Sequence, residues 1–181
     1  FTGTAGSITK TLTGTGSAQS LSLTAADLVT LGEGAITVST IAVDAAGNAA
    51  TSTSGGFSFD NTPPALTVAA VGDANKSIGD ATSVAGVISV TAESGNAVTV
   101  IFAGAGTVTK TLTGTGAGQT VALTSADLAT LGAGAISVTT AVTDAAGNVT
   151  TSTNGGFSLD TTPPTLTVAL AGDRSEEHTS E

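Results

Sequence analysis

The fold is decided by residues 97–103, which read Ala-Val-Thr-Val-Ile-Phe-Ala. In this stretch the apolar residues Val98, Val100 and Phe102 are each separated by one residue. Side chains two residues apart lie on the same face of a β-strand. The spacing therefore predicts a strand that turns one face towards a hydrophobic core.

The same period of two recurs six more times within residues 61–160. Gly, Asn and Ser are frequent between these segments, and they are the residues that turns favour. We therefore predict an all-β fold in which about seven short antiparallel strands form a sandwich of two sheets. The other six strands are expected to bury Leu66, Val68 and Ala70; Ile88, Val90 and Ala92; Val108 and Leu112; Val121 and Leu123; Ile136, Val138 and Val142; and Phe157 and Leu159.

One segment, residues 124–132, departs from this alternation. It opens with the hydroxyl of Thr124, continues with two leucines three residues apart and closes with glycine, a pattern typical of a short capped helix. Asp127, and Asp27 in the equivalent earlier segment, fall in the first turn, where the helix dipole favours negative charge. We predict a helix of one or two turns and give these carboxylates a structural role.

The sequence repeats with a period of 100 residues. Without any gap, 46 of 73 positions are identical between residues 1–73 and 101–173. A unit of this length is the size of a domain, so each repeat is expected to fold around its own core. We expect the chain to begin in mid-protein, with residues 1–60 as the C-terminal part of one unit, 61–160 as a complete unit and 161–173 as the start of a third.

Pairs of prolines mark where the units meet. Residues 60–64 read Asp-Asn-Thr-Pro-Pro, and residues 160–164 read Asp-Thr-Thr-Pro-Pro. Proline fixes its own φ and favours an extended residue before it. The linkers are therefore expected to be short and semi-rigid, holding neighbouring units end to end.

The composition excludes several classes of function. The chain has 14 acidic and 4 basic residues, a formal charge of −10. We therefore expect no nucleic-acid partner and no direct contact with an anionic membrane surface. There is no Cys, which excludes disulfides, thiolate metal sites and a cysteine nucleophile.

The single histidine, His178, lies in a tail whose composition changes abruptly. Residues 174–181 read Arg-Ser-Glu-Glu-His-Thr-Ser-Glu and resemble a translated sequencing adapter, so we expect this tail to be non-native. Without it the chain has no imidazole or thiol, and no base is placed to activate its many Ser and Thr. We predict that the protein is not an enzyme.

Four features occur together over residues 1–173. They are Asp-Ala-Ala-Gly-Asn at 44–48 and 144–148, a Phe-containing strand, the proline linker, and Ala-Asp-Leu-x-Thr-Leu-Gly-x-Gly at 26–34 and 126–134. In this order and spacing, the chain resembles the bacterial immunoglobulin-like repeats of large surface adhesins of the biofilm-associated type.

The resemblance implies tandem immunoglobulin-like sandwiches that act as a non-catalytic spacer and hold an adhesive domain away from the cell. It also implies calcium at the junctions and an extracellular or cell-surface location, commonly reached by a type I secretion system. The family often carries Gly-Asp-x-x-Ile-Asn after its first strand. Here residues 72–80 have Gly79 where Asn is expected, which counts against a site that uses that position.

Strand parity gives a separate argument for a metal. If successive strands run alternately up and down the unit, the loop 144–148 lies at the end that carries the preceding linker, and the loop 72–86 lies at the opposite end. Acidic and amide side chains should therefore gather at the unit ends. We expect three groups of ligands, one for each junction: Asp60, Asn61, Asp144 and Asn148; Asp73, Asp80 and Asp160; and Asp44 and Asn48, for a junction before residue 1.

Oxygen ligands without His or Cys favour a hard cation, and ligands from loops suit Ca²⁺ better than the strict octahedron of Mg²⁺. Our hypothesis is that calcium stiffens the junctions, with dissociation constants of about 10⁻⁴–10⁻³ M, as in extracellular modules. The alternative is that Asp-Ala-Ala-Gly-Asn is only a hairpin turn, with Gly147 and Asn148 supplying positive φ, and that Asp60 is only a turn residue before proline.

Two functions thus remain open from the sequence. One is a calcium-rigidified spacer whose partners are the adjacent repeats of the same chain. The other is a module that binds glycans, proteins or surfaces directly, or that associates with its own copies. The absence of Trp and Tyr, the usual platforms for such recognition, favours the spacer, whereas Thr-rich strand faces leave weak or ice-like contacts open.

Overall fold

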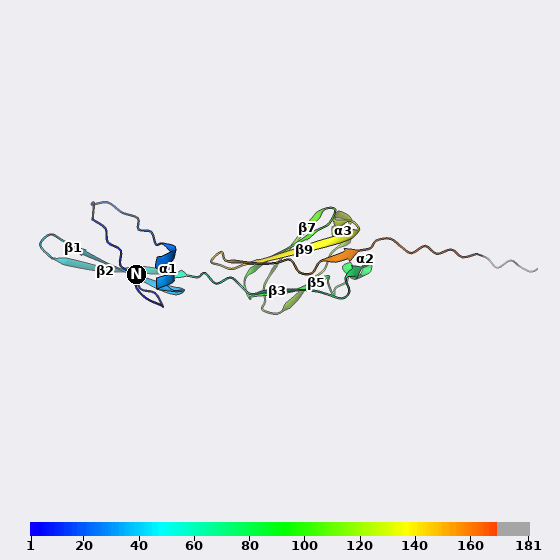
Figure 1. Ribbon diagram of the computed structural model, residues 1–181, viewed down its shortest axis with the longest axis horizontal. Helices are drawn as coiled ribbons and strands as arrows, with labels where there is room; N and C mark the ends of the chain where they lie inside the picture. Colours follow the sequence, from blue (N-terminus) through cyan, green and yellow to red (C-terminus); the bar gives the residue numbers. More distant parts are fainter. Residues whose placement is uncertain (170–181) are drawn as a thin grey trace, which may run out of the picture.

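The computed structural model describes residues 1–169, in which two β-rich units follow one another along the long axis (Figure 1). The first unit contains the helix α1 (Ala25–Leu31) and a hairpin of two long strands, β1 (Gly34–Val43) and β2 (Ala49–Phe59). The predicted tail, residues 174–181, lies outside the described residues.

The second unit contains nine strands and two short helices. In chain order they are β3 (Leu66–Ala70), β4 (Asn75–Lys76), α2 (Ile78–Ala81), β5 (Ile88–Ala92), β6 (Ala97–Ala103), β7 (Thr107–Thr113), β8 (Gly118–Val121), α3 (Ser125–Leu131), β9 (Gly134–Thr143), β10 (Val149–Ser152) and β11 (Phe157–Leu159).

These strands form the two layers of a sandwich. One sheet has three strands in the order β3-β5-β8, and all its pairs are antiparallel. The other has the order β4-β11-β9-β6-β7, with β10 also pairing with β9. Its pairs are antiparallel except the short one between β11 and β4. The predicted all-β sandwich is confirmed.

The core lies between the two sheets, where alternate residues of the facing strands meet. Phe102 is completely buried, and its ring packs edge-on against Phe157, with 6.5 Å between the ring centroids. Val98 and Val100 on the same face are buried as well, as the alternation in residues 97–103 predicts. Burial of such apolar side chains is the main source of stability for each unit.

The predicted short helix is present as α3, and α1 repeats it in the first unit. The Thr124 hydroxyl accepts a hydrogen bond from the Asp127 N–H, and the Asp127 carboxylate accepts one from the Thr124 N–H. Lys110 Nζ also lies 2.6 Å from the Asp127 carboxylate. Partial burial raises the pKa of Asp127, but the hydrogen bonds from Lys110 and Thr124 outweigh it, so the net shift is downward.

The same arrangement recurs in the first unit, where Lys10 pairs with Asp27 at 2.6 Å. The Lys10 ammonium is the main cause that lowers the pKa of Asp27 to about 2, helped by hydrogen bonds from Thr24. Asp127 therefore caps α3 and joins it to β7, and Asp27 caps α1 and joins it to the segment around Lys10. This is the structural role expected for both carboxylates.

Three elements were not foreseen from the sequence: β4, β10 and α2. Residues 149–152 of β10 are at most half-buried, so they lack the alternation that marks a core strand. The predicted fifth strand also ends at Val121, and Leu123 is buried just beyond it. Ala70, expected in the core, is exposed at the end of β3.

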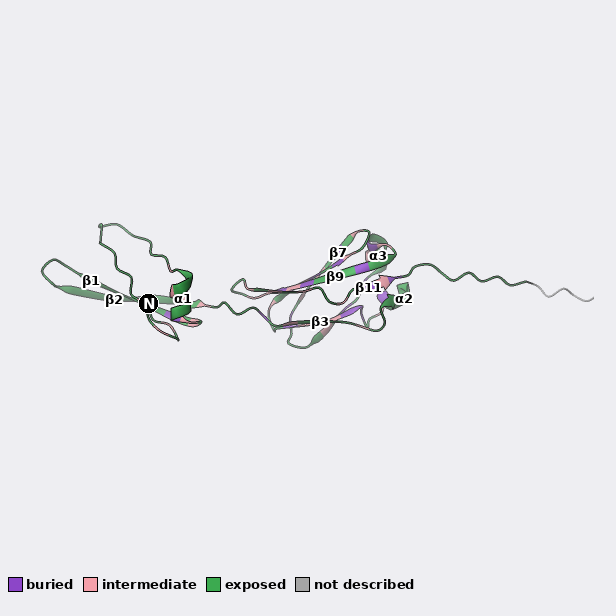
Figure 2. Cartoon of the chain, in the orientation of Figure 1, coloured by how far each residue is buried: buried purple, intermediate pink, exposed green. Residues whose placement is uncertain are grey.

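The first unit buries far less of its surface than the second (Figure 2). Leu31 and Ile36 are buried, but Phe57 is 44% exposed, whereas its equivalent Phe157 is 5% exposed. Among the described residues, the hairpin of β1 and β2 forms a sheet of two strands, and no second sheet covers it.

Candidate functional site

The linker between the units has a conformation that its own residues set. Asp60 Oδ1 accepts a hydrogen bond from the Thr62 N–H at 3.0 Å, which makes a tight turn just before the two prolines. Asp160 Oδ1 accepts the equivalent bond from the Thr162 N–H at 2.9 Å. Because proline fixes φ, the backbone continues extended into β3.

The second unit binds this linker through the end of the sandwich that faces the first unit. Asn148, in the loop after β9, donates its side-chain amide to the Asp60 carbonyl oxygen at 3.3 Å. The Thr150 hydroxyl, on β10, donates to the Pro64 carbonyl oxygen at 2.6 Å. The strand β10, missed in the sequence, thus contributes directly to the junction.

The first unit binds the linker through Glu33, just after α1. One of its carboxylate oxygens accepts from the Asn61 N–H at 3.2 Å, and the other accepts from the Thr62 hydroxyl at 2.6 Å. The sequence analysis missed Glu33. One feature of the sequence could have pointed to Glu33: the equivalent position of the second unit is Ala133, although the two segments otherwise match closely.

The Asp-Ala-Ala-Gly-Asn loop closes on itself in both units. Asp144 accepts from the Asn148 N–H at 2.8 Å and from its side-chain amide at 2.9 Å. Asp44 and Asn48 repeat both bonds, each at 2.8 Å. The Asn148 side chain is the main cause that keeps the pKa of Asp144 below its ordinary value, and Asn48 does the same for Asp44.

The same turn therefore forms in both units. Gly147 has the expected positive φ of 94°, but Asn148 does not, so that part of the turn alternative is wrong. Of the first group of proposed ligands, the structure brings Asp60 and Asn148 into contact, and Asp144 is joined to them through Asn148. Asn61 instead faces Glu33.

The second group of proposed ligands lies at the opposite end of the sandwich. The Asp160 N–H donates to the Lys76 carbonyl oxygen at 2.9 Å. Asp80 caps α2, where the Ser77 hydroxyl and N–H bind its carboxylate and lower its pKa, with a smaller contribution from Lys76. Asp73 is exposed in the loop between β3 and β4.

Lys76 at this end was not foreseen. It is only 4% exposed, and its ammonium donates to the Val71 carbonyl oxygen. Its positive charge also helps to lower the pKa of Asp80.

The described residues fit a metal only in part. Within residues 1–169, no three His, Cys, Asp or Glu side chains gather so that they could hold a metal ion. At the first junction a cation would draw on Asp60 and Asp144 and would need amide, backbone and water oxygens besides. Ca²⁺ accepts such mixed oxygen sets, so calcium stays a prediction at this junction.

A family model for the bacterial Ig-like domain (group 3) matches residues 23–124. The chain belongs to this family. The match begins one residue before Thr24, the N-cap of α1, and ends at Thr124, the N-cap of α3, so it covers one full period of the repeat and includes the linker. No curated protein and no solved structure matches the chain.

Bacterial Ig-like domains are generally structural modules without enzymatic activity, and they are typically extracellular or exposed on the cell surface. In the part of the chain that the structure describes, no helix is long and apolar enough to span a membrane. What the junction offers chemically is hydrogen bonding between two β-rich units and the peptide that joins them.

Proposed function

We propose that this chain is a spacer segment of a large bacterial surface or secreted adhesin. Its bacterial Ig-like units form a rod that projects an adhesive domain away from the cell in adhesion or biofilm formation. The partners of each unit are the adjacent repeats of the same chain, with no nucleic acid and no direct membrane contact.

The observation that carries this proposal is the linker held from both sides. Glu33 binds it from the first unit, and Asn148 and Thr150 bind it from the second. A tether that had only to connect two independent binding modules would need no such contacts. Contacts from both units restrict their relative orientation, as a spacer requires.

Calcium is the further part of this proposal. At the first junction we assign it to Asp60, Asn61, Asp144 and Asn148, of which the first two are exposed and the last two are half-buried. At the second it would use Asp73, Asp80 and Asp160, and before the first unit Asp44 and Asn48. Bound calcium would offset the repulsion between carboxylates and add to the stiffness of the rod.

Isothermal titration calorimetry of the full chain tests the calcium part. We expect heat of binding at millimolar calcium, reduced by Asp60→Asn and by Asp144→Asn. Glu93→Gln is the charge-matched control, because Glu93 lies at the same end of the second unit, where it binds the Ala65 N–H just after the linker, and is not one of the proposed ligands. The absence of heat above the buffer level in the wild-type chain would remove calcium from the account.

Binding arrays test the spacer part. We expect the full chain to bind no glycan, host protein or abiotic surface above the level of an unrelated acidic protein. Reproducible binding that survives physiological salt would favour the direct binding module instead. Antibodies against the chain should label intact cells of the bacterium that carries it, and loss of a type I secretion system should abolish that labelling.

A further inference from the structure

The two proline linkers of this chain are almost identical in sequence, yet the unit before each holds it differently. In the first, Glu33 supplies both hydrogen bonds that pass from the first unit to residues 61–64, within the described part of the chain. At the equivalent position before the second linker stands Ala133, which has no polar side-chain atom. Thr162 nevertheless makes the same local turn as Thr62.

Glu33 is held in place for this contact by its own backbone. It follows Gly32, which closes α1 with a φ of 76°, and its carbonyl oxygen accepts from the Thr4 hydroxyl at 2.6 Å. Both carboxylate oxygens are then directed at the linker, one to a backbone donor and one to a side-chain donor. Hydrogen bonds with a charged acceptor are stronger than neutral ones.

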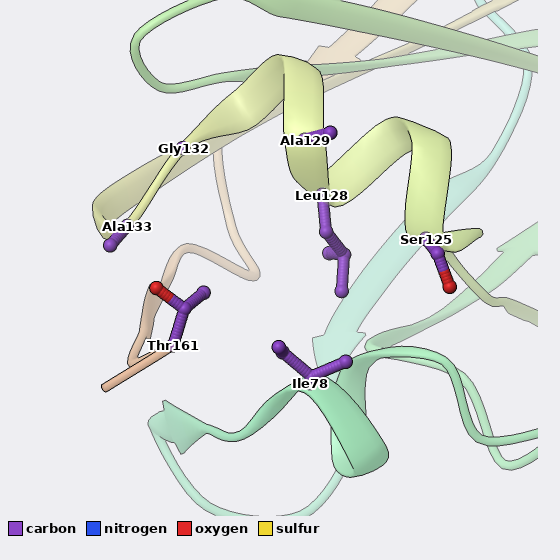
Figure 3. Close-up of a pocket in the computed structure, with 7 residues that line it drawn as sticks. All are labelled: Ile78, Ser125, Leu128, Ala129, Gly132, Ala133 and Thr161. Atoms are coloured by element: carbon purple, nitrogen blue, oxygen red, sulfur yellow. The ribbon is translucent and has the colours of Figure 1, made fainter. Parts of the chain in front are cut away.

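The end of the second unit has an open space beside Ala133. An open cavity of about 320 Å³ lies between α2, α3 and the second linker. Figure 3 shows Ala133 and Thr161 on one side of it, with Ile78 and Leu128 facing each other across the other side. A longer acidic side chain at position 133 would therefore have room beside Thr161, the equivalent of Asn61.

We infer that the residue at position 33 and its equivalents sets the stiffness of each junction: glutamate clamps the linker to the preceding unit, and alanine leaves it unclamped. This inference rests on the proposed spacer function, because stiffness matters in a rod. The Glu33 clamp uses N–H and O–H donors and needs no metal. A repeat array can therefore alternate stiff and compliant joints through one residue, without a change of linker sequence.

The test uses amide hydrogen exchange and ¹⁵N order parameters of the full chain, with a chelator present throughout. In the wild-type chain, the Asn61 amide should exchange more slowly than the Thr161 amide. Glu33→Ala should speed exchange at Asn61 by about tenfold, the effect of losing about one net hydrogen bond. Ala133→Glu should slow exchange at Thr161 by a similar factor, and the order parameters of Thr161 and Thr162 should rise towards about 0.85, typical of rigid backbone.

The matched control is Glu93→Ala, which removes the same charge and a hydrogen bond to the Ala65 N–H but makes no contact with Asn61. It should leave exchange at Asn61 unchanged. Unchanged exchange at Asn61 in Glu33→Ala, or at Thr161 in Ala133→Glu, would overturn the inference. Either result would be compatible with the spacer function, with two junctions of equal stiffness. Binding on the arrays would instead refute the spacer function, without bearing on the Glu33 contact.

Discussion

Thr140 lies in β9, in the middle of the sandwich core, and its side chain is completely buried. Its hydroxyl oxygen has no hydrogen-bond partner among the described residues. A buried hydroxyl without a partner costs about 1–3 kcal/mol relative to water. Valine has nearly the same shape and replaces the hydroxyl with a methyl group, which gains from burial. We therefore predict that Thr140→Val stabilises the second unit by about 1–2 kcal/mol.

The repeat supplies a matched control. Thr40 occupies the equivalent position of β1, but there it is exposed. Thr40→Val makes the same change of strand propensity without altering a core site. Surface substitutions usually change the free energy of unfolding by no more than about 0.5 kcal/mol. The difference between the two variants therefore isolates the buried hydroxyl.

The assay is urea unfolding followed by far-ultraviolet circular dichroism, because the chain has no Trp or Tyr to give useful fluorescence. The core methyl resonances of the second unit, followed by NMR, assign the transition to that unit. If the urea midpoint of Thr140→Val equals that of Thr40→Val, or lies below that of the wild type, the Thr140 hydroxyl is satisfied and the reasoning is refuted.

Two further changes test the junction turn and the core. In Asn148→Ala, the pKa of Asp144 should rise towards its ordinary value in an NMR titration, because the side chain that lowers it most is lost. A carboxylate whose pKa is lowered by folding stabilises the folded state at pH values above its ordinary pKa, and this stabilisation is lost as pH falls through the folded-state pKa. The variant should therefore lose less stability on acidification than the wild type. An unchanged pKa of Asp144 would contradict the assigned hydrogen bond. Gly155→Ala should destabilise the second unit more than Gly147→Ala, because both glycines have positive φ but only at Gly155 would a new Cβ lie 2.8 Å from the Ile88 side chain. Thermal unfolding measures both, and equal losses would contradict the packing.

Alternation of apolar residues was enough to predict the strands that face the core. The pattern at residues 97–103 works because β6 has a sheet neighbour on each side and one face on the opposite sheet. β10 gave no such pattern, because it packs no side chain fully into the core. α2 was hidden in an expected loop, although Ser77 and Asp80 have the spacing of a capping box.

The site could be predicted only where its contacts are local or follow from strand parity. Parity correctly set the loop of Asn148 beside the first linker, and Asn148 contacts the Asp60 carbonyl there. Glu33 could not be found this way, because its partners lie 28 and 29 residues further along and no local pattern joins them. The unit boundaries at residues 60 and 160 and the calcium ligands stay predictions.

The central claim is that the linker holds neighbouring bacterial Ig-like units in a fixed end-to-end arrangement. ¹⁵N relaxation of the full chain measures this directly, because it reports the tumbling of each unit and the order of the linker amides. The account predicts that both units share one anisotropic diffusion tensor and that Asn61 and Thr62 have order parameters near 0.85, the value of rigid backbone. Separate tumbling times for the two units, with linker order parameters below about 0.6, would contradict it.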